Sequence, residues 1–153
     1  MGWDELLRMA LMLALGVLLL SAGIEDARIR EIANAKNAAI ALLAPLWWFA
    51  HHLGWSDVGV QLLVATIVFA LFLGAFALGW MGGGDVKMIA ALALWLPLGG
   101  VVEMLTVMSI AGGAITVAML AERSWRRGEG AVEIPYGVAI AAAALLILPR
   151  TGF

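Results

Sequence analysis

Long apolar runs separated by short polar segments dominate this chain. Most of these runs approach the length of a membrane helix, which needs about 20 mostly apolar residues. The longest run, Met88–Ala121, contains only one charged residue, Glu103. As a single helix it would be about 50 Å long, whereas the hydrocarbon core of a bilayer is about 30 Å thick. We therefore expect a break at residues 97–100, Pro-Leu-Gly-Gly, because proline and paired glycines end helices.

The pattern predicts an all-α fold: a polytopic membrane protein with about six transmembrane helices in a single domain, residues 1–153. The expected spans are Leu6–Ile24, Ala38–Leu53, Val58–Trp80, Met88–Leu96, Val101–Ala121 and Ile134–Leu148. Composition supports this prediction, since 64% of the residues are hydrophobic and 13% are charged. Soluble domains are about 45–50% apolar and about 25% charged. A cytosolic enzyme and a nucleic-acid-binding module are thereby excluded, and membrane lipids are the expected surroundings.

The lysines and arginines indicate an orientation. Seven of the nine fall in segments 25–37, 79–87 and 122–133, and the other two are Arg8 and Arg150. Loops rich in lysine and arginine stay in the cytoplasm. We therefore expect these three segments on the cytoplasmic side and both termini outside.

Two acidic residues, Asp26 and Asp85, are expected at this same membrane boundary. Asp26 directly follows the first predicted span, and Asp85 precedes the fourth. In a close pair of carboxyls, partial desolvation and mutual repulsion raise one pKa, which leaves one acid and one base near neutral pH. Such a pair can activate water against a peptide carbonyl and protonate the departing nitrogen. Alternatively, both are capping or topology charges paired with neighbouring basic residues.

Three segments resemble the prepilin peptidases, which are membrane aspartic proteases. Residues Gly82-Gly83-Gly84-Asp85-Val86-Lys87 resemble the G-x-G-D-x-K signature of that family. Asp26 followed by Asn34 resembles its first catalytic block, although Ala33 stands where members usually have proline. Pro135-Tyr136-Gly137 resembles a third block, which opens the last helix. The glycines before Asp85 allow close backbone approach and positive φ angles. The small size and the Pro-Tyr-Gly block resemble the short peptidases of tight-adherence (Flp-type) pilus systems.

The resemblance implies a GxGD-type aspartic endopeptidase of the bacterial inner membrane, with Asp26 and Asp85 as the catalytic pair. Its implied substrate is an Flp-type prepilin, from which a short basic leader is removed at the cytoplasmic face. The implied supporting residues are Gly82, Gly83, Gly84, Lys87, Asn34, Pro135, Tyr136 and Gly137. No cofactor or metal is expected, and the adjacent residues His51 and His52 would make a poor metal site because they point in different directions. Self-association as a homo-oligomer is compatible with the sequence.

Other interpretations stay open at this point. A non-enzymatic transporter or pilus-assembly scaffold would use the aspartates as ion-binding or structural charges, although a relay needs acids near the midplane or on both faces. A presenilin-like protease shares the G-x-G-D element but takes its first aspartate from within a helix, whereas Asp26 is expected at a loop edge. Larger prepilin peptidases often carry a cysteine-rich insertion and also methylate the mature pilin. Since this chain has no cysteine, we expect cleavage without methylation.

Overall fold

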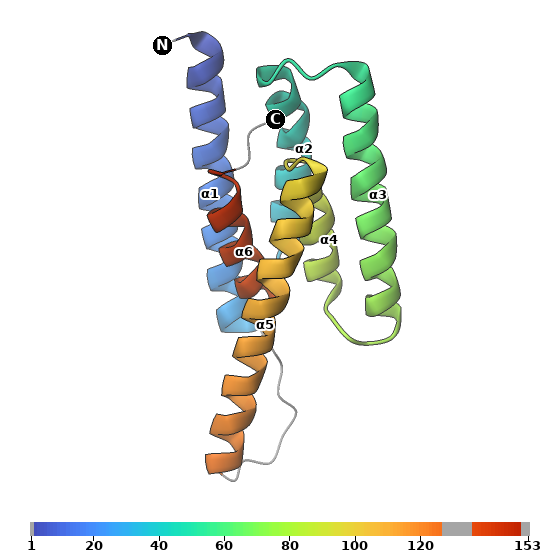
Figure 1. Ribbon diagram of the computed structural model, residues 1–153. Helices are drawn as coiled ribbons and strands as arrows, with labels where there is room; N and C mark the ends of the chain where they lie inside the picture. The colour runs from blue at the N-terminus through green and yellow to red at the C-terminus, as the bar shows by residue number, and fades with distance from the viewer. Residues whose placement is uncertain (1, 127–135, 151–153) are drawn as a thin grey trace.

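The computed structural model describes residues 2–126 and 136–150, and the described residues form six α-helices and no strand (Figure 1). The helices are α1 (Trp3–Ile29), α2 (Asn34–Ala50), α3 (Trp55–Ala77), α4 (Gly83–Ala93), α5 (Leu98–Arg126) and α6 (Tyr136–Ile147). The predicted all-α fold is confirmed. In the described part of the chain, α1, α3 and α5 are long and apolar enough to cross a membrane. Helix α4 has 11 residues and is about 16 Å long, so six complete crossings remain a prediction.

The helix bounds differ from the predicted spans, and two of the differences bear on the argument. Helix α1 does not end at Ile24 but continues to Ile29, so Asp26 lies in its last turn and not after it. Because Asp26 lies inside a helix, its position does not separate this chain from presenilin-like proteases. The predicted break occurs at Pro97, whose carbonyl accepts the first hydrogen bond of α5 from the Val101 N–H at 2.9 Å. The paired glycines that follow are part of α5 and do not break it.

The short helix α4 lies at the centre of the bundle. It packs against α2, α3, α5 and α6, while α1 packs against α2 and α6. Val86, Met88, Ile89 and Leu92 of α4 are all buried, as expected for a helix that is apolar on most sides. Because α4 is enclosed on several sides, its first turn has a fixed position relative to the ends of the neighbouring helices.

The C-terminal end of α4 exposes carbonyls that have no partner within the helix. The Trp48 indole donates a hydrogen bond to the Leu94 carbonyl at 2.7 Å, and the Trp47 indole donates to the Trp95 carbonyl at 3.1 Å. The buried amide of Gln61 donates to the Leu96 carbonyl at 2.8 Å. Backbone groups in an apolar interior need such partners. These three donors let the chain leave α4 inside the bundle.

The chain runs back and forth, so that the helix ends gather at two ends of the bundle (Figure 1). The C-terminal end of α1, the C-terminal end of α3 and the N-terminal ends of α2, α4 and α6 lie toward one end. The N-terminus of the chain and the turn between α2 and α3 lie at the other. Asp26 in α1 and Asp85 in α4 therefore lie toward the same end of the bundle.

Candidate active site

Asp26 connects the first helix to the last. Its side chain is 5% exposed, and Oδ2 accepts a hydrogen bond from the Val138 N–H at 3.2 Å. The Gly137 N–H also donates to this carboxyl group. Both donors belong to the first turn of α6, where N–H groups have no partner within the helix and the helix dipole is positive. Asp26 thus satisfies the hydrogen-bonding N–H groups at the start of α6, although α1 and α6 lie far apart in the sequence.

Gly137 permits this contact because it has no side chain. A Cβ atom at this position would lie 2.8 Å from Cγ of Asp26 and 2.8 Å from Cδ1 of Ile32, which is closer than such atoms approach. The next residue back, Tyr136, packs its ring against Gly112 of α5, where a Cβ would lie 3.1 Å from the ring. The third predicted block therefore meets Asp26 through Gly137, while Pro135 lies outside the described residues.

Asp85 is the third residue of α4 and is 8% exposed. Its carboxyl group accepts a hydrogen bond from the backbone N–H of Gly82, the residue that caps the helix. Burial, and secondly the nearby charge of Asp26, raise the pKa of Asp85 from 3.8 to about 6. The two carboxyls therefore interact electrostatically, and Asp85 keeps its proton up to about pH 6, well above the range of an ordinary aspartate.

The two aspartates line the same cavity, which has a volume of about 430 Å³. Arg30, Gly82 and Tyr136 also line it. A smaller cavity of about 280 Å³ is lined by both aspartates together with the following residues: Arg30, Glu31, Ile32, Asn34, Gly82, Gly83 and Gly84. The structure thus brings together residues of all three blocks that the sequence singled out.

The glycines before Asp85 allow side chains of other segments to lie close to the backbone. A Cβ on Gly84 would lie 3.3 Å from Cβ of Ile32, and one on Gly83 would lie 3.3 Å from the Phe76 ring. The run does not use the positive φ angles that glycine allows, since Gly82 has φ −73° and the glycine with positive φ in the described chain is Gly79. The chain reverses earlier, at Gly79, and arrives at α4 in an extended conformation.

Lys87 and Asn34 join α4 to α2 beside the site. Lys87 Nζ donates a hydrogen bond to Asn34 Oδ1 at 2.8 Å. Lys87 lines a separate groove between α2, α3 and α4, whereas Asn34 lines both this groove and the smaller aspartate cavity. Lys87 therefore holds Asn34 at the cavity edge and does not itself line the aspartate cavities.

The sequence prediction did not include an ionic connection between α1 and α2. Lys36 Nζ lies 2.8 Å from Glu25 Oε2 and donates to the Ser21 carbonyl at 3.1 Å. Glu25 Oε2 also accepts a hydrogen bond from the Ala33 N–H at 3.2 Å. Proline at position 33 could not donate this bond. The sequence does place opposite charges on both sides of a short loop. It does not show which of the nearby basic residues pairs with Glu25.

Asn37 was also missed by the sequence prediction. It is 4% exposed in α2, and its Nδ2 donates a hydrogen bond to the Gly84 carbonyl at 3.0 Å. The signal in the sequence was a polar residue within an otherwise apolar helix. Asn37 connects α2 directly to the glycine run that precedes Asp85.

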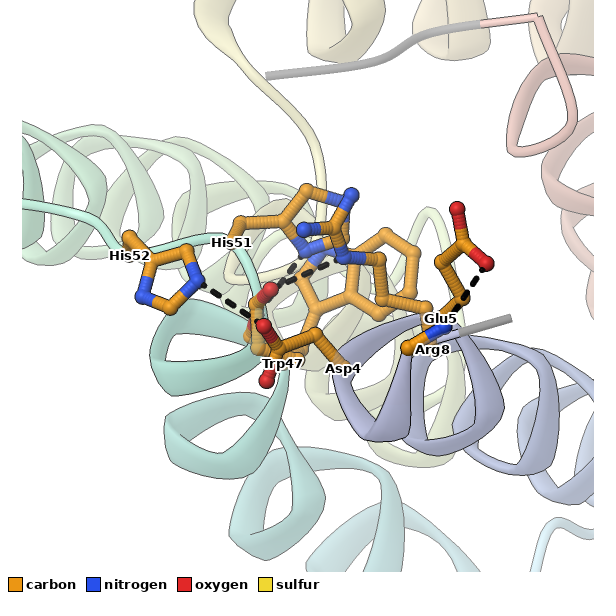
Figure 2. Close-up of polar contacts among 8 residues, drawn as sticks. Asp4, Glu5, Arg8, Trp47, His51 and His52 are labelled. Carbon is orange, nitrogen blue, oxygen red and sulfur yellow. Dashed lines mark hydrogen bonds and ion pairs between the residues drawn. The ribbon is translucent and has the colours of Figure 1, made fainter.

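A second polar cluster lies at the opposite end of the bundle and joins α1 to α2 (Figure 2). His52 Nε2 lies 3.3 Å from Asp4 Oδ2, and Arg8 Nε donates to the carbonyl of the last residue of α2 at 2.8 Å. His51 Nδ1 lies 3.0 Å from the Trp47 carbonyl. No group of three metal-ligating side chains occurs among the described residues. This cluster fastens α1 to α2.

Gly137→Ala should destabilise the protein. The added methyl group would collide with Asp26 and Ile32, and overpacking of this kind costs about 1–3 kcal/mol. The measurement is the thermal unfolding midpoint in detergent. Gly113→Ala is the matched control, because a Cβ there has no neighbour within 4 Å. Equal midpoints for both variants would contradict the close contact between α6 and Asp26.

Asp85→Asn should stabilise the protein at high pH. Because the folded state raises the pKa of Asp85 from 3.8 to about 6, the wild type loses stability as pH rises through this interval, by about 3 kcal/mol. Asparagine does not titrate, so the unfolding midpoint of the variant should exceed that of the wild type at pH 8 and approach it at pH 4.

Asp57→Asn provides the control for this experiment. Asp57 caps α3 in the same way, accepting a hydrogen bond from the Gly54 N–H at 3.1 Å, but it is exposed. Its replacement should not stabilise the protein at either pH. If both variants gave the same change, burial of Asp85 could not be the cause.

Comparison with known families agrees with this geometry. The type IV leader peptidase family matches residues 13–117, a range that includes Asp26 and Asp85 but ends before α6. Comparisons with curated proteins and with solved structures gave no match. The match covers more than half of the chain, and the long apolar helices identify a membrane protein. The chain therefore belongs to the type IV leader peptidase family, a family of proteases.

Proposed function

We propose that this protein is an aspartic endopeptidase that removes the short basic leader of type IV-like prepilins, with Asp26 and Asp85 as the catalytic pair. The observation that carries the proposal is that these two buried carboxyls, from distant helices, line one cavity. Gly137 leaves no room for a larger side chain beside Asp26, and Gly84 lies in tight contact with Ile32. A site built this tightly around two acids favours acid–base chemistry over a capping role.

The two carboxyls differ in the way that catalysis needs. Asp85 is the acid, because its pKa of about 6 leaves part of it protonated just below neutral pH, where an ordinary aspartate is fully ionised. Asp26 is the base, since its carboxyl group accepts hydrogen bonds from the Val138 and Gly137 N–H groups of α6, which favour its charged form. As the oxygen of water bonds to the scissile carbonyl carbon, Asp26 takes the proton of that water. Asp85 then gives its proton to the nitrogen as the carbon–nitrogen bond breaks, which yields a carboxyl group and an amine.

Several features support a basic peptide as the substrate. The larger cavity lies toward the end of the bundle and includes Glu31, an exposed acid that can attract a positively charged leader. The Pro-Tyr-Gly block favours the Flp-type branch of the family. The distribution of lysine and arginine favours the cytoplasmic face for this end of the protein.

A transport function has less support. Among the described residues, the buried polar side chains are Asp26, Asn37, Gln61 and Asp85. Asp26 and Asp85 share one end of the bundle, and Gln61 is bonded to the Leu96 carbonyl. A proton or ion relay needs polar groups that continue across the membrane, and these four residues do not supply them.

Asp26→Asn and Asp85→Asn should each abolish leader removal when the protein is produced together with an Flp-type prepilin. Asparagine keeps the shape of the side chain but cannot cycle a proton at neutral pH. The mass of the pilin measures the loss of the leader. Glu103→Gln, at an exposed acid of α5, should leave cleavage intact.

For the wild type, the rate of cleavage should fall as pH rises through about 6, where Asp85 loses its proton. Full cleavage by either well-expressed aspartate variant would end the proposal.

The proposed membrane orientation can be tested with a pair of fusions. A reporter fused after Trp80 should be active only in its cytoplasmic form, because Trp80 lies on the loop that leads to Asp85. A reporter fused after Leu53, in the turn at the opposite end of the bundle, should be active only in its exported form. The reverse pattern would put the aspartates outside and exclude cleavage at the cytoplasmic face.

A further inference from the structure

Arg30 ends α1 in a conformation that arginine rarely adopts. Its backbone is left-handed, with φ 58° and ψ 28°. In the described part of the chain, the other non-glycine residue with positive φ is His52. Glycine and asparagine adopt this conformation with less strain. A strained residue in a catalytic cavity is a candidate for a function that depends on its side chain.

Arg30 shares its cavities with both aspartates and forms an ion pair with neither. Arg30 lines the two cavities that contain Asp26 and Asp85. Its Nη1 atom is buried and has no hydrogen-bond partner. The ion pairs among the described residues are those of Lys36 with Glu25 and of His52 with Asp4. Arg30 nevertheless interacts electrostatically with Asp26. A buried donor on a charged group is costly to leave unsatisfied.

Because Arg30 lines the cavity, its guanidinium can donate a hydrogen bond to a peptide carbonyl that is held there. Substrate must lie between Asp26 and Asp85 for both carboxyls to act on it, and Arg30 lines the same space. During hydrolysis the carbonyl oxygen gains negative charge, and a cationic donor that is already in position stabilises that charge strongly in a partly desolvated site. Arginine is suited to the task because it stays protonated at every working pH.

We propose that Arg30 is a further catalytic residue whose guanidinium donates a hydrogen bond to the scissile carbonyl oxygen as the tetrahedral intermediate forms. The inference rests on the proposed roles of Asp26 and Asp85. When the oxygen of water bonds to the carbonyl carbon, the carbonyl electron pair moves onto its oxygen, opposite Arg30. When the carbon–nitrogen bond breaks, that pair re-forms the carbonyl and the nitrogen receives the Asp85 proton. Arg30 neither gains nor loses a proton.

The test measures kcat and KM of the purified full-length enzyme on an Flp-type prepilin in detergent. Arg30→Asn removes the guanidinium while keeping a residue that accepts the left-handed backbone. We expect kcat to fall about 100- to 1,000-fold, the loss typical for removal of one oxyanion donor, with KM changed less than threefold. Millimolar guanidinium should restore part of kcat.

Arg28→Asn is the matched control. Arg28 is exposed on the last turn of the same helix and lines neither aspartate cavity. Its kcat should stay within twofold of the wild type and should not respond to guanidinium. Arg30→Lys keeps the positive charge at the end of α1 but lacks the planar guanidinium, so its kcat should lie between those of the wild type and Arg30→Asn.

Each other outcome overturns the inference. A rise in KM at constant kcat would make Arg30 a binding group for the ground state of the substrate. A lowered thermal midpoint for Arg30→Asn and Arg30→Lys, with no recovery in guanidinium, would make its role structural. Unchanged kcat for Arg30→Asn would remove Arg30 from the reaction, while Asp85→Asn would still be inactive if the catalytic pair is right. Cleavage by Asp85→Asn would instead overturn the proposed function itself.

Discussion

The contact between the Asp26 carboxylate and the first turn of α6 is the interaction on which the rest of the site depends. It satisfies unpaired N–H groups of α6 and places a buried charge against the positive end of that helix. Gly137 has to be a glycine because the carboxyl group and Ile32 occupy the space of its side chain. Ile32 in turn packs against Gly84 of α4. A short series of contacts therefore leads from one aspartate to the helix that carries the other.

The second constraint is the length of α4. An 11-residue helix is too short for a bilayer, so one of its ends has to lie inside the protein. The buried end is the C-terminal one, where indole and amide donors satisfy the carbonyls of residues 94–96. The other end carries Asp85 and lines the cavity. Burial of Asp85 in the cavity that it shares with Asp26 also raises its pKa, so the arrangement that we propose for catalysis opposes stability above pH 6.

The helices and the aspartate pair could be predicted because they depend on local patterns. Apolar runs indicate helices, Pro97 indicates the break, and the glycine run marks Asp85. Features that depend on packing could not be predicted. The end of α1 is set by the left-handed backbone of Arg30 and not by the last apolar residue. The glycine run avoids a collision with Ile32, a residue from another part of the chain. The roles of Arg30 and Asn37 appear only when α1, α2 and α4 are assembled.

Ala33 shows how a departure from a family pattern can be understood physically. Proline at this position would restrict the loop through its fixed φ angle but would donate no hydrogen bond. Alanine loses that restriction and gains an N–H group, which donates to Glu25. Glu25 is also paired with Lys36, and Lys36 reaches back to the Ser21 carbonyl, so the loop is fastened to both helices that it joins. The same loop carries Ile32, which contacts Gly84 and lies against the position of Gly137. A hydrogen-bonded ion pair thus takes over the task of holding the loop beside Asp26.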